Sequence, residues 1–144
     1  MITIEKLLFL INTPSLAEPK DYFLKEGFVL EQNTNENLMW VKPLKIDRAA
    51  VVSLWRMESA YKTVDYRFYE EGELADIQKD ATANFGFELI EDEEATIMRT
   101  EEFQLRLKKD EHPPFISYSL KLYRRNKQRE VERIEVSMSP PPGV

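Results

Sequence analysis

The chain has 144 residues, 42% of them hydrophobic and 32% charged, which is typical of one folded globular domain. It has no cysteine and one histidine, which excludes disulfides, thiolate nucleophiles and metal sites built from several cysteines or histidines of one chain. The four glycines are dispersed, so there is no nucleotide-binding loop, and we expect neither a metal nor a cofactor.

The formal net charge of −6 is unevenly distributed. Residues 1–98 hold 10 Lys/Arg and 19 Asp/Glu, whereas residues 99–133 hold 10 Lys/Arg and 6 Asp/Glu. An acidic chain repels nucleic acid at long range, so we do not expect a nucleic-acid partner. Apolar runs are far shorter than the roughly 20 residues that span a bilayer, and the N-terminus lacks the basic segment of a signal peptide. We therefore expect a cytoplasmic protein with no membrane contact; the absence of cysteine also fits a secreted chain whose signal has been removed.

The N-terminal segment is predicted to form a helical hairpin. Apolar residues recur at helical spacing from Ile4 to Ile11, and Pro14 ends that helix. A capping-box pattern predicts a second helix over residues 16–26, which would bury Leu24. Gly27 then provides the C-cap.

Strand patterns follow the hairpin, with one longer helix between them. Alternating or continuous apolar residues predict strands at 28–31, 38–42, 49–58 and 62–70. A helix over the segment EEGELADIQKDATANF is closed by Gly86. Further strands are predicted at 87–91, 95–108, 115–124 and 131–138, and residues 139–144 form a flexible Pro-rich tail.

The order of elements indicates an internal duplication. The segment KEGFVLE at 25–31 is echoed by NFGFELIE at 84–91, each between a helix and several strands. We predict a single α+β domain over 1–138, built from two tandem helix-plus-antiparallel-strand units at about 14–70 and 71–138. About eight strands form the sheet, with the helices packed on one face. In architecture alone, this order resembles duplicated binding proteins of the β-lactamase inhibitory protein type.

No credible catalytic set is present. His112 lies between acids and prolines in a predicted exposed loop, where a general base would lack positioned partners. The acidic runs at 91–94 and 70–73 lack the alternating ligands and the glycine of a calcium loop. A carboxylate pair for glycoside chemistry depends on a distance that sequence does not give.

The most suggestive group is basic and aromatic. In FQLRLKK the apolar and basic residues alternate, so the basic ones share one sheet face. A sheet that presents cations and an aromatic ring can bind a protein or a small anionic ligand, or can simply be a solvated surface. The candidate surface residues are Arg99, Arg106, Lys108, Lys121, Tyr123, Arg125 and Trp40.

The two tryptophans are assigned opposite roles. Trp55 lies in a segment that is apolar on both faces, which favours packing in the core. Trp40 is next to a polar hairpin and is the better candidate for partial exposure and for an interface anchor.

Three functional hypotheses follow. The first is a non-enzymatic binding module that uses a sheet face or strand loops. The second is a small acidic inhibitor or immunity-type protein that neutralises a basic partner through its N-terminal half, with Glu70, Glu71 and Asp76 as contacts. The third is a hydrolase that depends on a carboxylate pair and would require a closed polar cleft.

Overall fold

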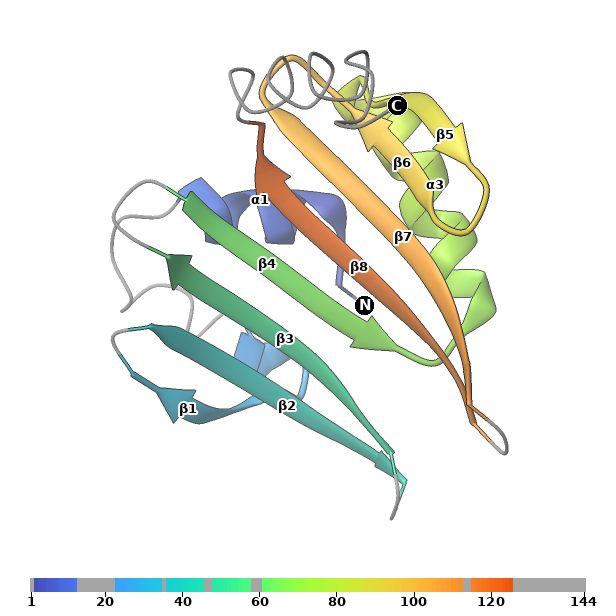
Figure 1. Ribbon diagram of the computed structural model, residues 1–144. Helices are drawn as coiled ribbons and strands as arrows, with labels where there is room; N and C mark the ends of the chain where they lie inside the picture. Colours follow the sequence, from blue (N-terminus) through green and yellow to red (C-terminus); the bar gives the residue numbers. More distant parts are fainter. Residues whose placement is uncertain are drawn as a thin grey trace, which may run out of the picture.

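The structure is a computed structural model that describes residues 2–12, 23–34, 36–45, 48–57, 61–112 and 115–125, with the backbone alone at 56, 57, 61 and 62. The described strands form one eight-stranded antiparallel sheet in the order β1-β2-β3-β4-β8-β7-β6-β5 (Figure 1). The elements are α1 (Ile4–Asn12), β1 (Val29–Asn33), β2 (Asn37–Lys45), β3 (Arg48–Met57), β4 (Tyr61–Phe68), α3 (Glu71–Phe85), β5 (Glu88–Asp92), β6 (Thr96–Arg99), β7 (Phe103–His112) and β8 (Phe115–Arg124).

The α+β class is confirmed, but the strands are divided differently from the prediction. The segment predicted as one strand at 95–108 contains a turn that separates β6 from β7. Thr100 makes this turn: its amide donates to the Phe103 carbonyl at 2.9 Å, and its hydroxyl accepts from the Phe103 amide at 2.9 Å. The predicted strand at 131–138, the tail at 139–144 and the helical start at 16–22 lie outside the described residues.

Glycine ends both helical segments that precede an edge strand. Gly27 follows a helical turn at residues 23–25 with φ 89°, and Gly86 follows α3 with φ 70°. Such positive φ values favour glycine because they bring a Cβ too close to the backbone. The helical pattern predicted that Leu24 is buried, but it is 57% exposed. Its neighbour Phe23 packs into the core from the same turn, and Leu24 points away from it.

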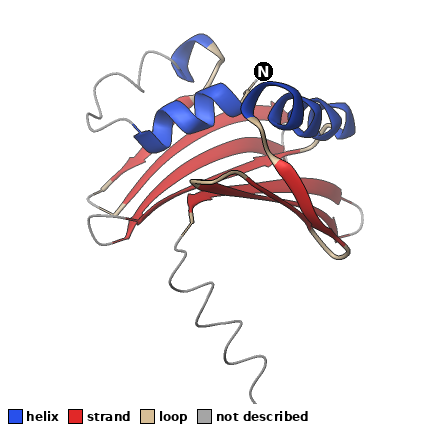
Figure 2. Ribbon diagram, turned by 90° about the horizontal axis from the view of Figure 1, so that it is seen from above, coloured by secondary structure: helices blue, strands red, loops and turns tan. Residues whose placement is uncertain are grey.

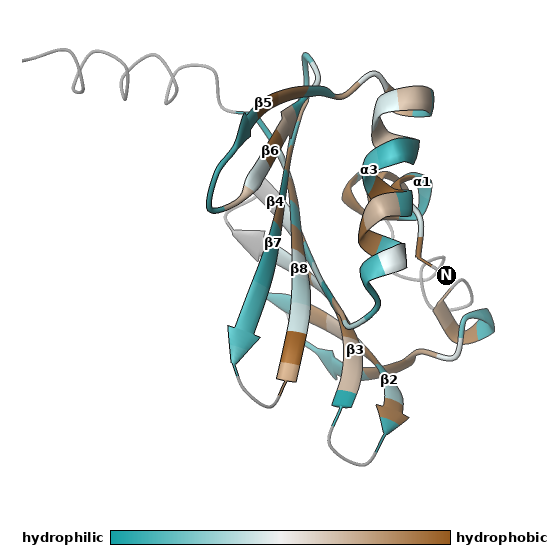
Figure 3. Cartoon of the chain, turned by 90° about the vertical axis from the view of Figure 1, so that its right-hand side faces the viewer, coloured by the Kyte–Doolittle hydropathy of each residue, from teal (hydrophilic) through white to brown (hydrophobic). Residues whose placement is uncertain are grey.

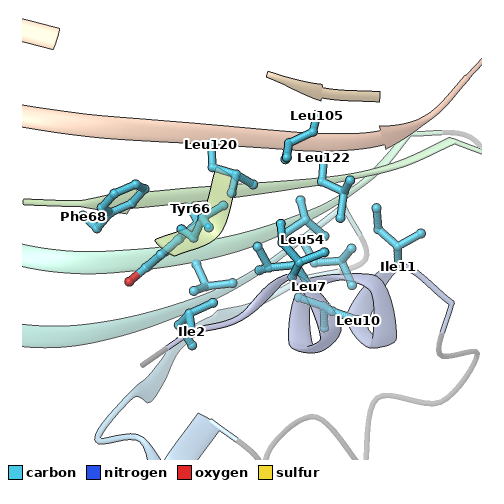
Figure 4. Packing of buried hydrophobic residues seen from close by; sticks show 14 of the residues in the cluster. Ile2, Leu7, Leu10, Ile11, Leu54, Tyr66, Phe68, Leu105, Leu120 and Leu122 are labelled. Atoms are coloured by element: carbon cyan, nitrogen blue, oxygen red, sulfur yellow. The ribbon is translucent and has the colours of Figure 1, made fainter. Parts of the chain in front are cut away.

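The core lies between the helices and one face of the sheet. Figure 2 shows α1 and α3 on the same side of the sheet, and Figure 4 shows side chains of α1 pointing towards those of the strands. A buried row crosses six strands through successive backbone pairs: Leu38, Leu54, Val64, Leu122, Leu105 and Met98. Among the described residues, helices contact only this face of the sheet, and we call the opposite face the open face.

None of the helices in the described part of the chain combines the length and apolar character needed to cross a membrane.

Candidate functional site

Strand alternation determines which side chains lie on the open face. In β4, Val64 and Tyr66 are buried towards the helices, whereas Asp65 and Arg67 point the other way. The pairing of β4 with β8 sets Asp65 opposite Lys121 at the centre of the sheet. On the open face, the side chains of paired residues thus form rows that run across the strands, with one side chain from each strand.

Four cations predicted as surface residues share this face. Arg106 of β7 pairs with Lys121 of β8, Lys108 lies two residues further along β7, and Arg99 extends from β6. Arg106, Lys108 and Lys121 are exposed, and Arg99 is half-buried. Arg67 adds a fifth cation from β4. The centre of the open face is therefore locally basic on a chain of net charge −6, while Asp110 lies 3.9 Å from Lys108 and Glu88 is paired opposite Arg99 towards its edge.

Side-chain hydrogen bonds hold one row of the open face in place. Arg99 donates through Nε to Gln104 Oε1 at 2.6 Å, and the Gln104 amide donates to the Tyr123 hydroxyl. Thr63 lies beside Tyr123 across the β4–β8 pairing. Because its polar atoms are bound within the row, Tyr123 presents an oriented ring edge rather than a freely rotating side chain.

Asp65 is the acid among these central cations. Burial raises its pKa, while the charge of Lys121 and a hydrogen bond from the Trp55 side chain act in the opposite direction. The Asp65 side chain therefore lies near both Trp55 on β3 and Lys121 on β8. We interpret Asp65 as a residue that orients both neighbours.

The other half of the open face combines apolar side chains with the uncharged polar residues Ser53, Asn37 and Gln32. Val29, Val41 and Val51 form a continuous cross-strand row from β1 to β3, and Val29 is 51% exposed. Met39 adjoins this row, and Trp55, which is 40% exposed, lies beyond Ser53 on β3. Adjoining apolar side chains at the surface of a domain commonly mark an interaction site.

Both tryptophan predictions were wrong. Trp40 is 1% exposed and stacks on Phe23 with ring centroids 4.7 Å apart, so it belongs to the core. Trp55 lies on the open face. The two residues lie on adjacent strands, and strand parity places them on opposite sides of the sheet because Trp40 pairs with buried Val52. A segment that is apolar on both faces gives no sequence signal of which face is covered.

Arg125 does not take part in the open face as predicted. Its guanidinium donates through Nη1 to the Thr100 carbonyl at 2.8 Å, and its amide donates to the Glu102 carbonyl at 2.8 Å. Arg125 therefore holds the β6–β7 turn. Its neighbour Arg124 points to the helix side, where it bonds Asn12 at the end of α1 and pairs with Glu102 at 2.9 Å.

The other sequence candidates do not converge. His112 is exposed at the end of β7, opposite Phe115. Residues 91–94 are exposed at the β5–β6 turn. Within the described ranges, no cluster of three or more His, Asp or Glu side chains is arranged to hold a metal ion.

A separate cavity of about 420 Å³ lies on the helix side. Its lining includes Phe28, Lys42, Arg48 and Phe68 and, at its polar end, the two carboxylates of Glu26 and Glu73. In Figure 3 the paired ends of β2 and β3, which contribute Lys42, Leu44, Lys45 and Arg48 to this lining, extend past the start of α3. Exposed residues such as Leu44, at 45%, make up its rim.

The two carboxylates of this cavity are in contrasting environments. Glu26 forms an ion pair with Lys6, and that hydrogen bond lowers the pKa of Glu26 to about 2. Burial raises the pKa of Glu73, although the buried Tyr66 hydroxyl donates a 2.5 Å hydrogen bond to it. At neutral pH Glu26 is ionised, and Glu73 binds its proton more tightly than an ordinary glutamate.

Sequence reasoning missed Trp55, Asp65 and Arg67 as members of the open face. The signal for Asp65 and Arg67 was available, because both alternate with Val64, Tyr66 and other apolar residues in β4. What sequence could not supply is the β4–β8 pairing, which brings these residues beside Lys121 from more than fifty positions away.

A scan against protein-family models, a search of curated proteins and a search of solved structures each found no match for the chain.

Proposed function

We propose that the chain is a non-enzymatic binding module and that its open face binds a protein partner carrying acidic side chains beside an apolar surface. The observation that carries this proposal is the division of one face into two halves. Val41, Val51 and Trp55 provide the apolar half, whereas Arg106 and Lys121 belong to the basic half.

The composition of the open face supports a protein rather than a nucleic acid as the partner. Protein interfaces are enriched in aromatic residues, Met and Arg, and this face presents Trp55, Tyr123, Met39, Arg67 and Arg106. An acidic protein repels a polyanion at long range, whereas a discrete basic patch can still steer an acidic protein surface into register. A small anionic ligand would use the basic half alone and leave the apolar half exposed.

We also infer that the two halves of the sheet are the tandem units predicted from sequence. The strand order is symmetric about the β4–β8 pairing, and both edge strands shift register at matching places, between Leu30 and Gln32 and between Leu89 and Glu91. In this arrangement Asp65 and Lys121 occupy corresponding positions. A repeat with this symmetry supports a broad binding surface to which both units contribute.

Charge reversal on the open face tests the proposal. The test variant is Arg106→Glu/Lys108→Glu, in which both positions are exposed on β7. The matched control is Lys25→Glu/Lys79→Glu, which makes the same change in net charge at exposed positions remote from the open face. Trp55→Ala tests the apolar half independently.

The probe is a phage-displayed library of random peptides, panned on the immobilised wild-type protein. We expect enriched peptides to combine Asp or Glu with aliphatic or aromatic residues. They should bind the test variant and Trp55→Ala at least about tenfold more weakly, while binding the control as they bind wild type. Failure to enrich any sequence, or equal binding to all four proteins, would refute the proposal. Tighter binding of a single-stranded oligonucleotide than of the peptides would redirect it to nucleic acid.

A second candidate function is the acidic inhibitor. Glu70, Glu71 and Asp76 are all exposed near the start of α3, which favours contact with a basic partner from that side. Charge reversal of these three residues should then slow association with such a partner, whereas the open-face variants should leave the association rate unchanged.

A carboxylate-dependent hydrolase is a third candidate because the cavity is lined by both Glu26 and Glu73, whose pKa values are shifted in opposite directions. Pairs of acids with separated pKa values are typical of acid–base catalysis. Turnover of any substrate by the purified protein, lost in Glu73→Gln, would support this function over binding alone.

A further inference from the structure

The cavity on the helix side combines an apolar wall with three cations, Lys42, Lys45 and Arg48, and three acids, Glu26, Glu70 and Glu73. Its wall includes Phe28, Ala50 and Phe68, all buried. Its volume of about 420 Å³ lies in the range of small-molecule sites, about 300–1,000 Å³. The cavity is on the opposite side of the sheet from the open face, so it can be tested separately from the proposed protein interface.

Neighbouring residues already compensate two of the three acids around the cavity. Lys6 pairs with Glu26, and Tyr66 donates a hydrogen bond to Glu73. The third acid, Glu70, is exposed at the rim.

The two lysines of the cavity are less closely paired than these acids. Across the described residues, neither Lys42 nor Lys45 has an acidic partner within 4.0 Å. Lys42 is half-buried, and its ammonium lies 6.0 Å from the centroid of the Phe28 ring. A half-buried ammonium against an aromatic wall loses hydration that an anion could replace.

Arg48 places a second cation in the same cavity. Its guanidinium lies 4.9 Å from the centroid of Phe115 and 5.9 Å from that of Tyr69. Stacking on rings restricts the orientation of a guanidinium, and a planar guanidinium matches the two oxygens of a carboxylate. Lys42 reaches the cavity from β2, and Arg48 reaches it from β3. The two strands remain paired as far as Lys45 and Arg48.

We propose that this cavity is a binding site for a small organic carboxylate with an apolar body. The carboxylate pairs with Lys42 and Arg48, and the body lies against Phe28 and Phe68. The Tyr66–Glu73 pair forms the polar wall and disfavours a second negative charge on the ligand. Such a ligand supplies Lys42 with an ion-pair partner within 4.0 Å, which it lacks among the described residues, where its charge acts on Glu73 only at longer range.

Matched triples of small molecules test the proposal. Each triple holds the body constant and changes only the head group, for example 3-phenylpropionate, 3-phenylpropionamide and 3-phenylpropylamine. Binding is measured by ligand-observed NMR and by the shift in melting temperature of the full chain. We expect the carboxylates to bind at least about tenfold more tightly than the amides, with the amines weakest.

Three variants locate the binding. Lys42→Met should weaken carboxylate binding at least about tenfold, while Lys79→Met, on the exposed side of α3, should leave it unchanged. Ala50→Leu fills the cavity and should abolish binding of every triple even if Lys42→Met proves too unstable to study. Absence of binding by all carboxylates, equal binding of amides, tighter binding of amines, or equal effects of Lys42→Met and Lys79→Met would overturn the assignment. A peptide that binds through its C-terminal carboxylate would confirm the chemistry and identify the ligand as a chain end.

Discussion

Replacing each tryptophan by alanine is expected to have opposite effects on stability and on binding. Trp40 is 1% exposed and stacked on Phe23, so Trp40→Ala removes a filled volume that surrounding atoms cannot easily occupy. Deletions of this kind cost about 3–5 kcal/mol in the free energy of unfolding. Trp55 is 40% exposed and has water rather than a second layer above it, so no enclosed cavity forms when it is removed. We expect Trp55→Ala to cost about 1–2 kcal/mol, including its hydrogen bond to Asp65.

Urea denaturation followed by circular dichroism measures both costs. A single domain has a total free energy of unfolding of about 5–15 kcal/mol, so the loss expected for Trp40→Ala is a large part of it. If Trp40→Ala does not fold, the milder Trp40→Phe takes its place. Fluorescence gives an independent readout, since Trp40→Phe leaves only the exposed indole and Trp55→Phe only the buried one. The emission of Trp55→Phe should therefore lie at shorter wavelength. A larger loss of stability in Trp55→Ala than in Trp40→Ala, or the reverse order of emission, would refute the assignment of the two faces.

Two further predictions concern stability. Gly86→Ala should destabilise the protein by about 1–2 kcal/mol in thermal or urea unfolding because φ is 70° there. The control, Gly72→Ala, places its Cβ where no atom lies within 4 Å and should be neutral or stabilising by up to about 1 kcal/mol. Equal effects of the two substitutions would contradict the left-handed cap at Gly86. Glu73→Gln should gain stability relative to wild type as pH rises. Burial raises the folded pKa of Glu73 above 4.5, so wild type is stabilised by its proton at low pH and loses that contribution as pH rises through the folded pKa. The glutamine side chain does not titrate and can still accept the hydrogen bond from the Tyr66 hydroxyl. A difference in stability between the two proteins that does not change with pH would show that the pKa of Glu73 is not raised by folding.

Local signals were sufficient for most elements of the fold. The helical spacing from Ile4 to Ile11, the alternation in β4 and the glycine after α3 each act within one turn or one strand, and the corresponding elements are present. The β6–β7 turn was missed because its residues, Thr100 to Glu102, include no glycine or proline, and the turn is made by hydrogen bonds of Thr100.

The candidate site was less predictable because it depends on partners that are distant in sequence. Alternation in β7 correctly grouped Arg106 with Lys108, since both are two residues apart on one strand. It could not show that Arg125 bonds a turn carbonyl or that Trp40 stacks on Phe23. Those outcomes depend on which element packs over which face, and no periodicity within a single strand carries that information.

Under the repeat that we infer, corresponding positions on the two faces of the sheet are constrained differently. Buried positions of both halves fill one core, so Val52 in β3 has as its counterpart the equally apolar Leu105 in β7. Positions on the open face are less restricted, and there Asp65 corresponds to Lys121 and Ser53, which is 8% exposed, to Arg106. A repeat used only as a scaffold would tend to carry soluble side chains on both open halves. Exposed valines and a tryptophan on one half beside cations on the other are better explained by a partner that contacts both.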